Sequence, residues 1–213
     1  MNSDAKVSSW REATAPLWRN NMALAQLLGL CPLLAVTTTV VNGLALGLAS
    51  AIIVVIVSTT MSLLRGVLLP STRLLLAMLI LAALVTVVDL FAEAQLYDLH
   101  ERLGLFVPLI VVNSGVIAHA ENVASRRGVA FTFLSAVATG LGFLSAMVAL
   151  GALREILGSG TLLAGFEMLG GDGSMTLELP FDGMLVAVLP PGAFFGMAIL
   201  LALRNRLARK AAP

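Results

Sequence analysis

Long apolar stretches separated by short polar ones fill most of the chain. The hydrocarbon layer of a bilayer is roughly 30 Å thick, so a helix that crosses it needs about 20 mostly apolar residues. Six stretches suited to this role occur at residues 22–41, 44–64, 74–91, 105–120, 129–153 and 184–203. The pattern therefore predicts an all-α integral membrane protein with six transmembrane helices. Near the second stretch, the spacing of Gly43 and Gly47 favours close helix packing.

The amino-acid composition also indicates a membrane protein. Hydrophobic residues make up 59% of the 213 residues and charged residues only 12%, whereas a soluble domain is about a quarter charged. This balance excludes an ordinary soluble protein and a disordered chain. The 13 Lys and Arg residues against 12 Asp and Glu leave a net charge of +1, which also excludes a nucleic-acid partner. The lipid bilayer is the expected surrounding.

Positive charges are unevenly distributed between the two sides of the predicted membrane domain. Eleven of the 13 Lys and Arg residues fall in the first tail, the second and fourth loops, and the last tail. Because short loops rich in Lys and Arg stay in the cytoplasm, both termini are predicted to be cytoplasmic. The chain then divides into a cytoplasmic amphipathic lead-in (1–21), a six-helix membrane domain (22–203) with an outer loop (154–183), and a basic cytoplasmic tail (204–213).

The first and fourth predicted spans contain residues that interrupt helices. Pro32 lies mid-span in the first, where it would remove a helical hydrogen bond, and Pro108 with residues 113–115 interrupts the fourth. Aligning residues 32–38 with 108–114 places similar sequences at the head of two groups of three spans. Since successive three-span units have opposite orientations, this predicts a 3+3 inverted repeat with a site where the interrupted helices meet near the midplane.

Four blocks of sequence resemble one known family of membrane proteins. They read QLLGLCPLLAVT at 26–37, GLFVPLIVVNSGVIAHAE at 104–121, ALREILGSGTL at 152–162 and LPPGAFFGM at 189–197. In this order they resemble the E subunits of the Rnf (Rsx) ion-translocating electron-transport complexes. They are more distantly similar to the D subunits of the sodium-pumping NADH:quinone reductases.

The resemblance implies a subunit of an ion-translocating ferredoxin:NAD oxidoreductase in the bacterial inner membrane, active only within its complex. Its implied partners are a homologous A-type sister subunit of opposite orientation and flavin-bearing subunits. The sister pair would hold an iron-sulfur cluster, expected to be 2Fe-2S, in the middle of the membrane. Electrons would cross the bilayer through it, coupled to Na⁺ or H⁺ transport. No nucleotide or flavin motif occurs in this sequence.

Cys31 matches the first cysteine of the family and is the candidate metal ligand; its simpler interpretation is a small buried hydrophobic residue. Ser114 stands where relatives have the second cysteine, and the chain contains no other cysteine. Thiolate is softer than a serine oxygen and suits iron-sulfur clusters better. Ser114 is therefore either a direct ligand or a residue that hydrogen-bonds between helices.

Two further ionisable residues lie near the ends of spans. Asp89 lies near the outer end of the third, and His119 lies near the cytoplasmic end of the fourth. An ion path for Asp89 and proton transfer for His119 are the functional interpretations, because an ionisable group inside a membrane is a functional candidate. The simpler interpretation of each is a helix end that meets water.

Two other functions fit the pattern of spans. A secondary transporter is one, because broken helices and inverted repeats are common in transporters. A mainly structural subunit of the same complex is the other, with its redox ligation partly lost at Ser114.

Overall fold

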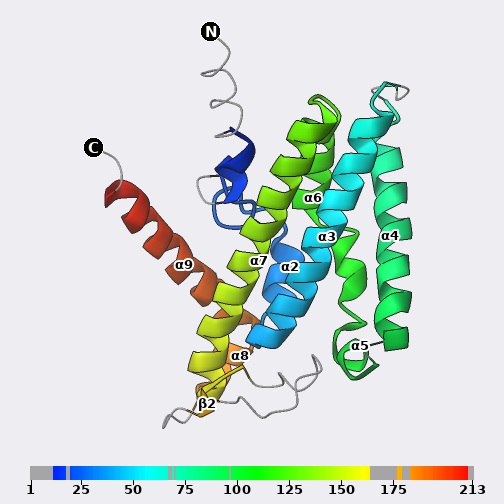
Figure 1. The fold of residues 1–213 in the computed structure, drawn as a ribbon. Helices are drawn as coiled ribbons and strands as arrows, with labels where there is room; N and C mark the ends of the chain where they lie inside the picture. Colours follow the sequence, from blue (N-terminus) through cyan, green and yellow to red (C-terminus); the bar gives the residue numbers. More distant parts are fainter. Residues whose placement is uncertain are drawn as a thin grey trace.

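The computed structural model describes residues 12–17, 20–66, 69, 71–95, 97–163, 177–178 and 183–210. They form an all-helical fold apart from one antiparallel ladder of two short strands (Figure 1). In chain order the elements are η1 (Ala15–Leu17), α2 (Leu30–Val36), α3 (Val40–Leu64), α4 (Arg73–Gln95), α5 (Tyr97–Leu103), η2 (Val107–Ile110), α6 (Ser114–His119), the π-helical η3 (Ala120–Ala124), α7 (Val129–Ser159), β1 (Thr161–Leu162), β2 (Leu177–Glu178), α8 (Leu185–Val188) and α9 (Pro190–Lys210).

Within the described residues, four helical segments are long and apolar enough to cross a membrane. They are Val40–Leu64, Arg73–Gln95, Val107–Ala124 and Val129–Ser159. These segments overlap the second to fifth predicted spans, which confirms a multi-pass membrane protein. The last of them continues past residue 153, because α7 includes two buried charged residues that the sequence pattern had assigned to the outer loop.

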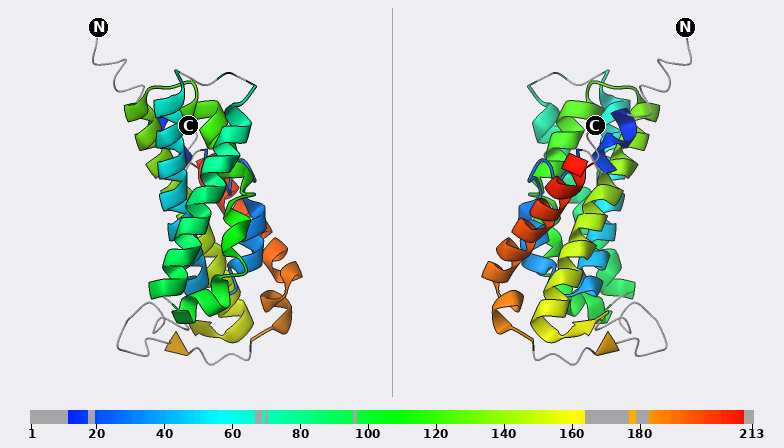
Figure 2. Two further views of the ribbon diagram at one scale, coloured as in Figure 1. Left: turned by 90° about the vertical axis from the view of Figure 1, so that its right-hand side faces the viewer. Right: turned by 90° about the vertical axis from the view of Figure 1, so that its left-hand side faces the viewer.

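The antiparallel pair α3 and α7 forms the centre of the fold (Figures 1 and 2). Glycines bring the two helices together: a Cβ added to Gly43 would lie 2.9 Å from the carbonyl oxygen of Met147. At the other end of the contact, a Cβ on Gly151 would lie 2.8 Å from the carbonyl oxygen of Thr39. The predicted close packing at Gly43 is therefore confirmed, and it occurs within this chain.

The first predicted span is mostly not a helix. Residues 21–29 are not helical, with turns at 22–25, and α2 begins only at Leu30, after Gly29 in the left-handed conformation (φ 72°). Pro32 is therefore in the first turn of α2, where a missing backbone N–H removes no helical hydrogen bond. The prediction that Pro32 breaks a helix at mid-span is wrong. The helix is short because it starts late and ends before Thr39, which caps α3.

The fourth predicted span is divided into three short pieces. Pro108 lies at the start of the 3₁₀ helix η2, and the chain then turns at residues 111–113 before α6 begins at Ser114. The Asn113 side chain accepts a hydrogen bond from the backbone N–H of Gly115 (3.0 Å) and so caps α6. A π-helical turn follows directly after α6.

The last predicted span contains a short helix and a long one. Leu189 is extended between α8 and α9, so Pro190 and Pro191 open α9 instead of kinking a continuous helix. Residues 204–210, assigned from the sequence to the basic tail, continue α9. Figure 1 shows α9 leaning away from the bundle, and Arg204 connects it to the 20–29 segment through the carbonyl oxygen of Leu24 (3.2 Å).

The basic loops lie together at one end of the molecule. The turn after α3, with Arg65, and the turn before α7, with Arg126 and Arg127, are at the same end as the C-terminal end of α9 (Figures 1 and 2). The opposite end holds α5, α8 and the strand ladder. Within the described residues, the basic positions of the second and fourth loops therefore lie at one end of the fold.

Candidate functional site

Cys31 is the second residue of α2, and its side chain is exposed on the surface of this chain. The interpretation of Cys31 as a buried hydrophobic residue is therefore wrong. A thiol on the outer surface of the bundle can contact a group that another chain holds.

Ser114 lies beside the start of the Cys31 helix. The backbone N–H of Gly29 donates a hydrogen bond to Ser114 Oγ across 3.1 Å, although the two residues are 85 positions apart in the sequence. The two segments that the sequence singled out thus meet, as expected of a site shared between the first and fourth spans. The Ser114 hydroxyl forms the inter-segment hydrogen bond predicted as one of its two roles.

The contact between these two segments is tight. A Cβ at Gly29 would lie 2.7 Å from Asn113 Oδ1 and 3.1 Å from Phe143 of α7. Asn113 is fully buried, and its Nδ2 atom has no hydrogen-bond partner among the described residues. The Asn113 amide nitrogen, a hydrogen-bond donor, is therefore buried next to Ser114 in the sequence.

The donor set of this chain offers one thiol near the junction. Among the described residues, no group of three or more His, Cys, Asp or Glu side chains is placed to hold a metal ion. The residues therefore fit a contribution to a shared metal centre, with one exposed thiol and a neighbouring hydroxyl, and do not fit a complete centre within this chain.

Arg154 of α7 holds the ends of two short helices, a role that the sequence reasoning missed. Only 2% of the residue is exposed. Its guanidinium donates hydrogen bonds to the carbonyl oxygens of Leu34 in α2 (3.2 Å) and of Ala187 and Val188 in α8 (3.2 and 2.6 Å). A cation at helix C-termini is favourable because unpaired carbonyls carry partial negative charge there.

Glu155 places a negative charge at the N-terminus of a helix, whereas Arg154 places a positive charge at helix C-termini. It is fully buried, and its Oε2 accepts a hydrogen bond from the backbone N–H of Val40, the first residue of α3 (2.7 Å). A carboxylate is favourable there because the first N–H groups of a helix lack intrahelical acceptors. Adjacent charges at the end of an apolar run were the available signal for both residues.

His119 is buried among three helices. Its Nδ1 atom lies 2.9 Å from Ser58 Oγ of α3, and its Nε2 atom lies 3.1 Å from Ser135 Oγ of α7. The interpretation of His119 as a solvated helix end is therefore wrong, because only 7% of the residue is exposed.

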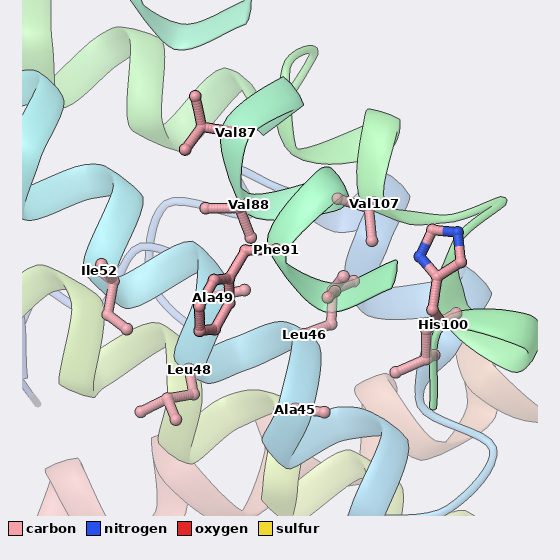
Figure 3. A pocket seen from close by; sticks show the side chains of 12 residues that line it. Ala45, Leu46, Leu48, Ala49, Ile52, Val87, Val88, Phe91, His100 and Val107 are labelled. Carbon is pink, nitrogen blue, oxygen red and sulfur yellow. The ribbon is translucent and has the colours of Figure 1, made fainter. Parts of the chain in front are cut away.

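Asp89 is partly exposed and lies beside His100 of α5, with 3.4 Å between Oδ1 and Nδ1. A cavity of about 420 Å³ lies next to this pair, lined by α3, α4, α5 and η2 (Figure 3). Its lining is apolar except for His100; Phe91 and Val88 face it from α4, and Ala49 from α3. The cavity does not include Cys31 or Ser114.

Comparison with known proteins places the chain among subunits of one kind of membrane complex. A family model described as "Rnf-Nqr subunit, membrane protein" matches residues 9–201. The chain is 44% identical over 212 residues to the E subunit of the ion-translocating oxidoreductase complex of Pseudoalteromonas atlantica, covering 98% of this chain and 90% of that protein.

Other relatives carry the same name. The E subunit from Thioalkalivibrio sulfidiphilus is 45% identical over 202 residues, covering 92% of this chain and 89% of the relative. The E subunit from Haemophilus ducreyi is 43% identical over 203 residues, covering 93% and 89%. Together with the family match over nearly the whole chain, these likenesses identify the protein as a member of the Rnf-Nqr family of membrane subunits.

Proposed function

We propose that this chain is a membrane subunit of an ion-translocating ferredoxin:NAD oxidoreductase of the Rnf type, which relays electrons across the inner membrane coupled to Na⁺ or H⁺ transport. Its relatives are named as the E subunit of an ion-translocating oxidoreductase complex. The observation that carries the redox role is the exposed Cys31 thiol, two residues after Gly29, where the start of α2 is hydrogen-bonded to the start of α6.

Cys31 is the proposed ligand of an iron-sulfur cluster, of the 2Fe-2S type, shared with a homologous sister subunit. Such a cluster supplies one-electron transfer when bound. An exposed thiol supports sharing, because ligands from another chain can approach it. The Gly29–Ser114 hydrogen bond and the Asn113 cap of α6 hold the local backbone in place.

The proposed membrane arrangement has six spans in a 3+3 inverted repeat with both termini in the cytoplasm. The directions of the helices support this arrangement (Figure 1). The helices α2, α3 and α4 alternate in direction, and so do the segments η2–α6, α7 and α9. Each member of the second group runs opposite to its counterpart in the first: η2–α6 to α2, α7 to α3, and α9 to α4. Under this arrangement, the end that carries Arg65, Arg126 and Arg127 faces the cytoplasm.

Large apolar side chains on α8 and α9 support a neighbouring subunit or lipid on that side of the bundle. Leu185, Phe194 and Phe195 are each more than half exposed in this chain. Because α9 also contacts α2, this apolar surface adjoins the helix that carries Cys31. The sister subunit is the proposed occupant, with the flavin-bearing subunits elsewhere in the complex.

The metal claim is tested in the purified whole complex by iron analysis and electron paramagnetic resonance. Cys31→Ala is expected to remove the iron and the spectrum of one cluster. Ala35→Ser is the matched control, because Ala35 is exposed one turn later on the same helix and is expected to leave both unchanged. Unchanged iron content and unchanged spectra in Cys31→Ala would refute the ligand role.

A mainly structural subunit is the second candidate. The observation that favours it is the Ser114 hydroxyl, which already accepts the hydrogen bond of Gly29 and so joins two segments without a metal. Ser114→Cys separates the two functions. A change in cluster spectrum or potential favours the redox subunit, whereas an unchanged spectrum with a lower melting temperature favours the structural role.

A further inference from the structure

The ring of His119 is held by a hydroxyl on each side. Ser58 of α3 contacts Nδ1 at 2.9 Å, and Ser135 of α7 contacts Nε2 at 3.1 Å. In a neutral imidazole one ring nitrogen donates and the other accepts, while each serine hydroxyl can do either. The three groups therefore form a chain of hydrogen bonds whose direction can reverse when a proton is added or moved.

A polar cavity reaches this ring from the exposed surface. Its volume is about 200 Å³, which is room for several water molecules, each of which occupies about 30 Å³ in the liquid. Asn20 and Gln26, both exposed, line it together with Asn122, Ser135 and His119. Water from the basic end of the molecule thus has a polar route to the Nε2 side of the ring.

The ring lies inside the apolar part of the bundle. Ser58 is six residues before the end of α3 and Ser135 six residues after the start of α7, so both are about 9 Å from the helix ends. A π-helical turn follows His119 directly, and such turns occur frequently at functional sites.

The surroundings of His119 supply polar but uncharged groups. One helical turn from the two serines lie Thr132 and Thr139 on α7 and Ser62 on α3, and Thr139 also lines the cavity. The charged residues whose side chains are described at this end of the bundle are Glu12, Arg65, Arg73, Glu121, Arg126, Arg127, Arg204 and Arg206. None of them lines the cavity, so the only titratable group there among the described residues is His119.

We propose that His119 is a proton-binding site inside the membrane domain, loaded from water in this cavity. A hydronium ion in the cavity gives a proton to Ser135 Oγ while that hydroxyl passes its own proton to Nε2, which leaves a water molecule and an imidazolium. Nδ1–H then donates to Ser58. Reversal of the same steps returns the proton to water, and no electrons are exchanged.

The alternative is a polar link that only holds three helices together. Both roles need the serine contacts, but a link needs neither the cavity nor a change of protonation. Proton binding therefore distinguishes them. Proton binding at His119 does not depend on the proposed function; only the use of that proton in ion translocation rests on it. The His119 site shares no residue with the proposed metal centre.

Exchange of the imidazole C2 hydrogen with deuterium in the intact complex tests proton binding. This exchange passes through the protonated ring, so the dependence of its rate on pH, followed by mass spectrometry of the His119 peptide, gives a titration midpoint for that ring. A measurable rate with a midpoint is expected. His100, partly exposed at the opposite end, is the internal control for exchange conditions. Exchange at His100 with none at His119 at any pH would overturn the proposal.

The use of the proton is tested in proteoliposomes that contain the whole complex. His119→Gln is expected to lower proton uptake per electron while electron transfer continues, and Ser135→Ala to slow proton uptake. Ser50→Ala is the matched control, because Ser50 is also buried but its hydroxyl has no hydrogen-bond partner among the described residues. Unchanged proton uptake in His119→Gln would refute the translocation role, whereas loss of a Cys31-dependent cluster spectrum would bear only on the proposed redox function.

Discussion

Arg154 offers the sharpest test of how the short helices are held. Replacing it with methionine keeps the length and much of the apolar stem of the side chain but removes the guanidinium. The carbonyl oxygens of Leu34, Ala187 and Val188 then lose their side-chain donor. Thr37 Oγ1, 3.3 Å from the guanidinium, loses a donor as well but keeps its own hydrogen bond to Leu33.

The magnitude follows from these contacts. A buried polar group left without a partner costs about 1–3 kcal/mol, and three carbonyl groups are affected. Part of this cost is offset because the variant no longer buries a cation, so the net loss is about 3 kcal/mol. At about 2–4 °C per kcal/mol for a chain of this size, the melting temperature should fall by about 6–12 °C.

Thermal unfolding of the purified complex, followed by loss of the intact species on size exclusion, measures this change. Arg126→Met is the matched control, because Arg126 is exposed and its loss should leave the melting temperature unchanged. Arg154→Lys should lie between the wild type and Arg154→Met, since an ammonium cannot reproduce the planar set of guanidinium donors. Equal melting temperatures for Arg154→Met and Arg126→Met would refute the role assigned to Arg154.

Substitutions at three other positions, two of them with a matched control variant, test the packing. Glu155→Leu removes the acceptor of the Val40 N–H and should lower the melting temperature of the complex, whereas Glu155→Gln, which keeps an acceptor oxygen, should do so less; equal effects would count against the hydrogen bond. Gly43→Ala places a methyl group 2.9 Å from a backbone oxygen of α7 and should cost about 1–3 kcal/mol in unfolding experiments, while Gly66→Ala, with open space around it, should cost nothing measurable. Gly29→Ala forces φ 72° on an alanine and should cost about 1 kcal/mol or more; a wild-type melting temperature would contradict the observed conformation.

The long spans could be predicted because their signal is local. The apolar runs of α3, α4 and α7 exceed the length needed to cross a bilayer, and a run of that length is visible in the sequence without knowledge of distant contacts. The late start of α2 could not be predicted in this way. It depends on residue 21, whose side chain binds Gly142 at 2.7 Å, and on the contact of Gly29 with Ser114.

The site was predictable only in part for the same reason. Cys31 and Ser114 were found through motifs, and their segments do meet. Glu155 was assigned to a loop because a charge normally ends a span, but a helix end in three dimensions can satisfy it. The burial of His119 could not be predicted because its two serine partners lie 61 and 16 residues away in the sequence.

The 20–29 segment also bears on the order in which the protein is made. Its shape depends on the Asn21 side chain, which binds Gly142, and on Gly29, which binds Ser114; these partners are 121 and 85 residues further along the chain. A ribosome releases the segment long before it delivers either partner. The first part of the membrane domain to be synthesised is therefore among the last to reach its final conformation, and Cys31 reaches its final position only after α6 and α7 have been inserted.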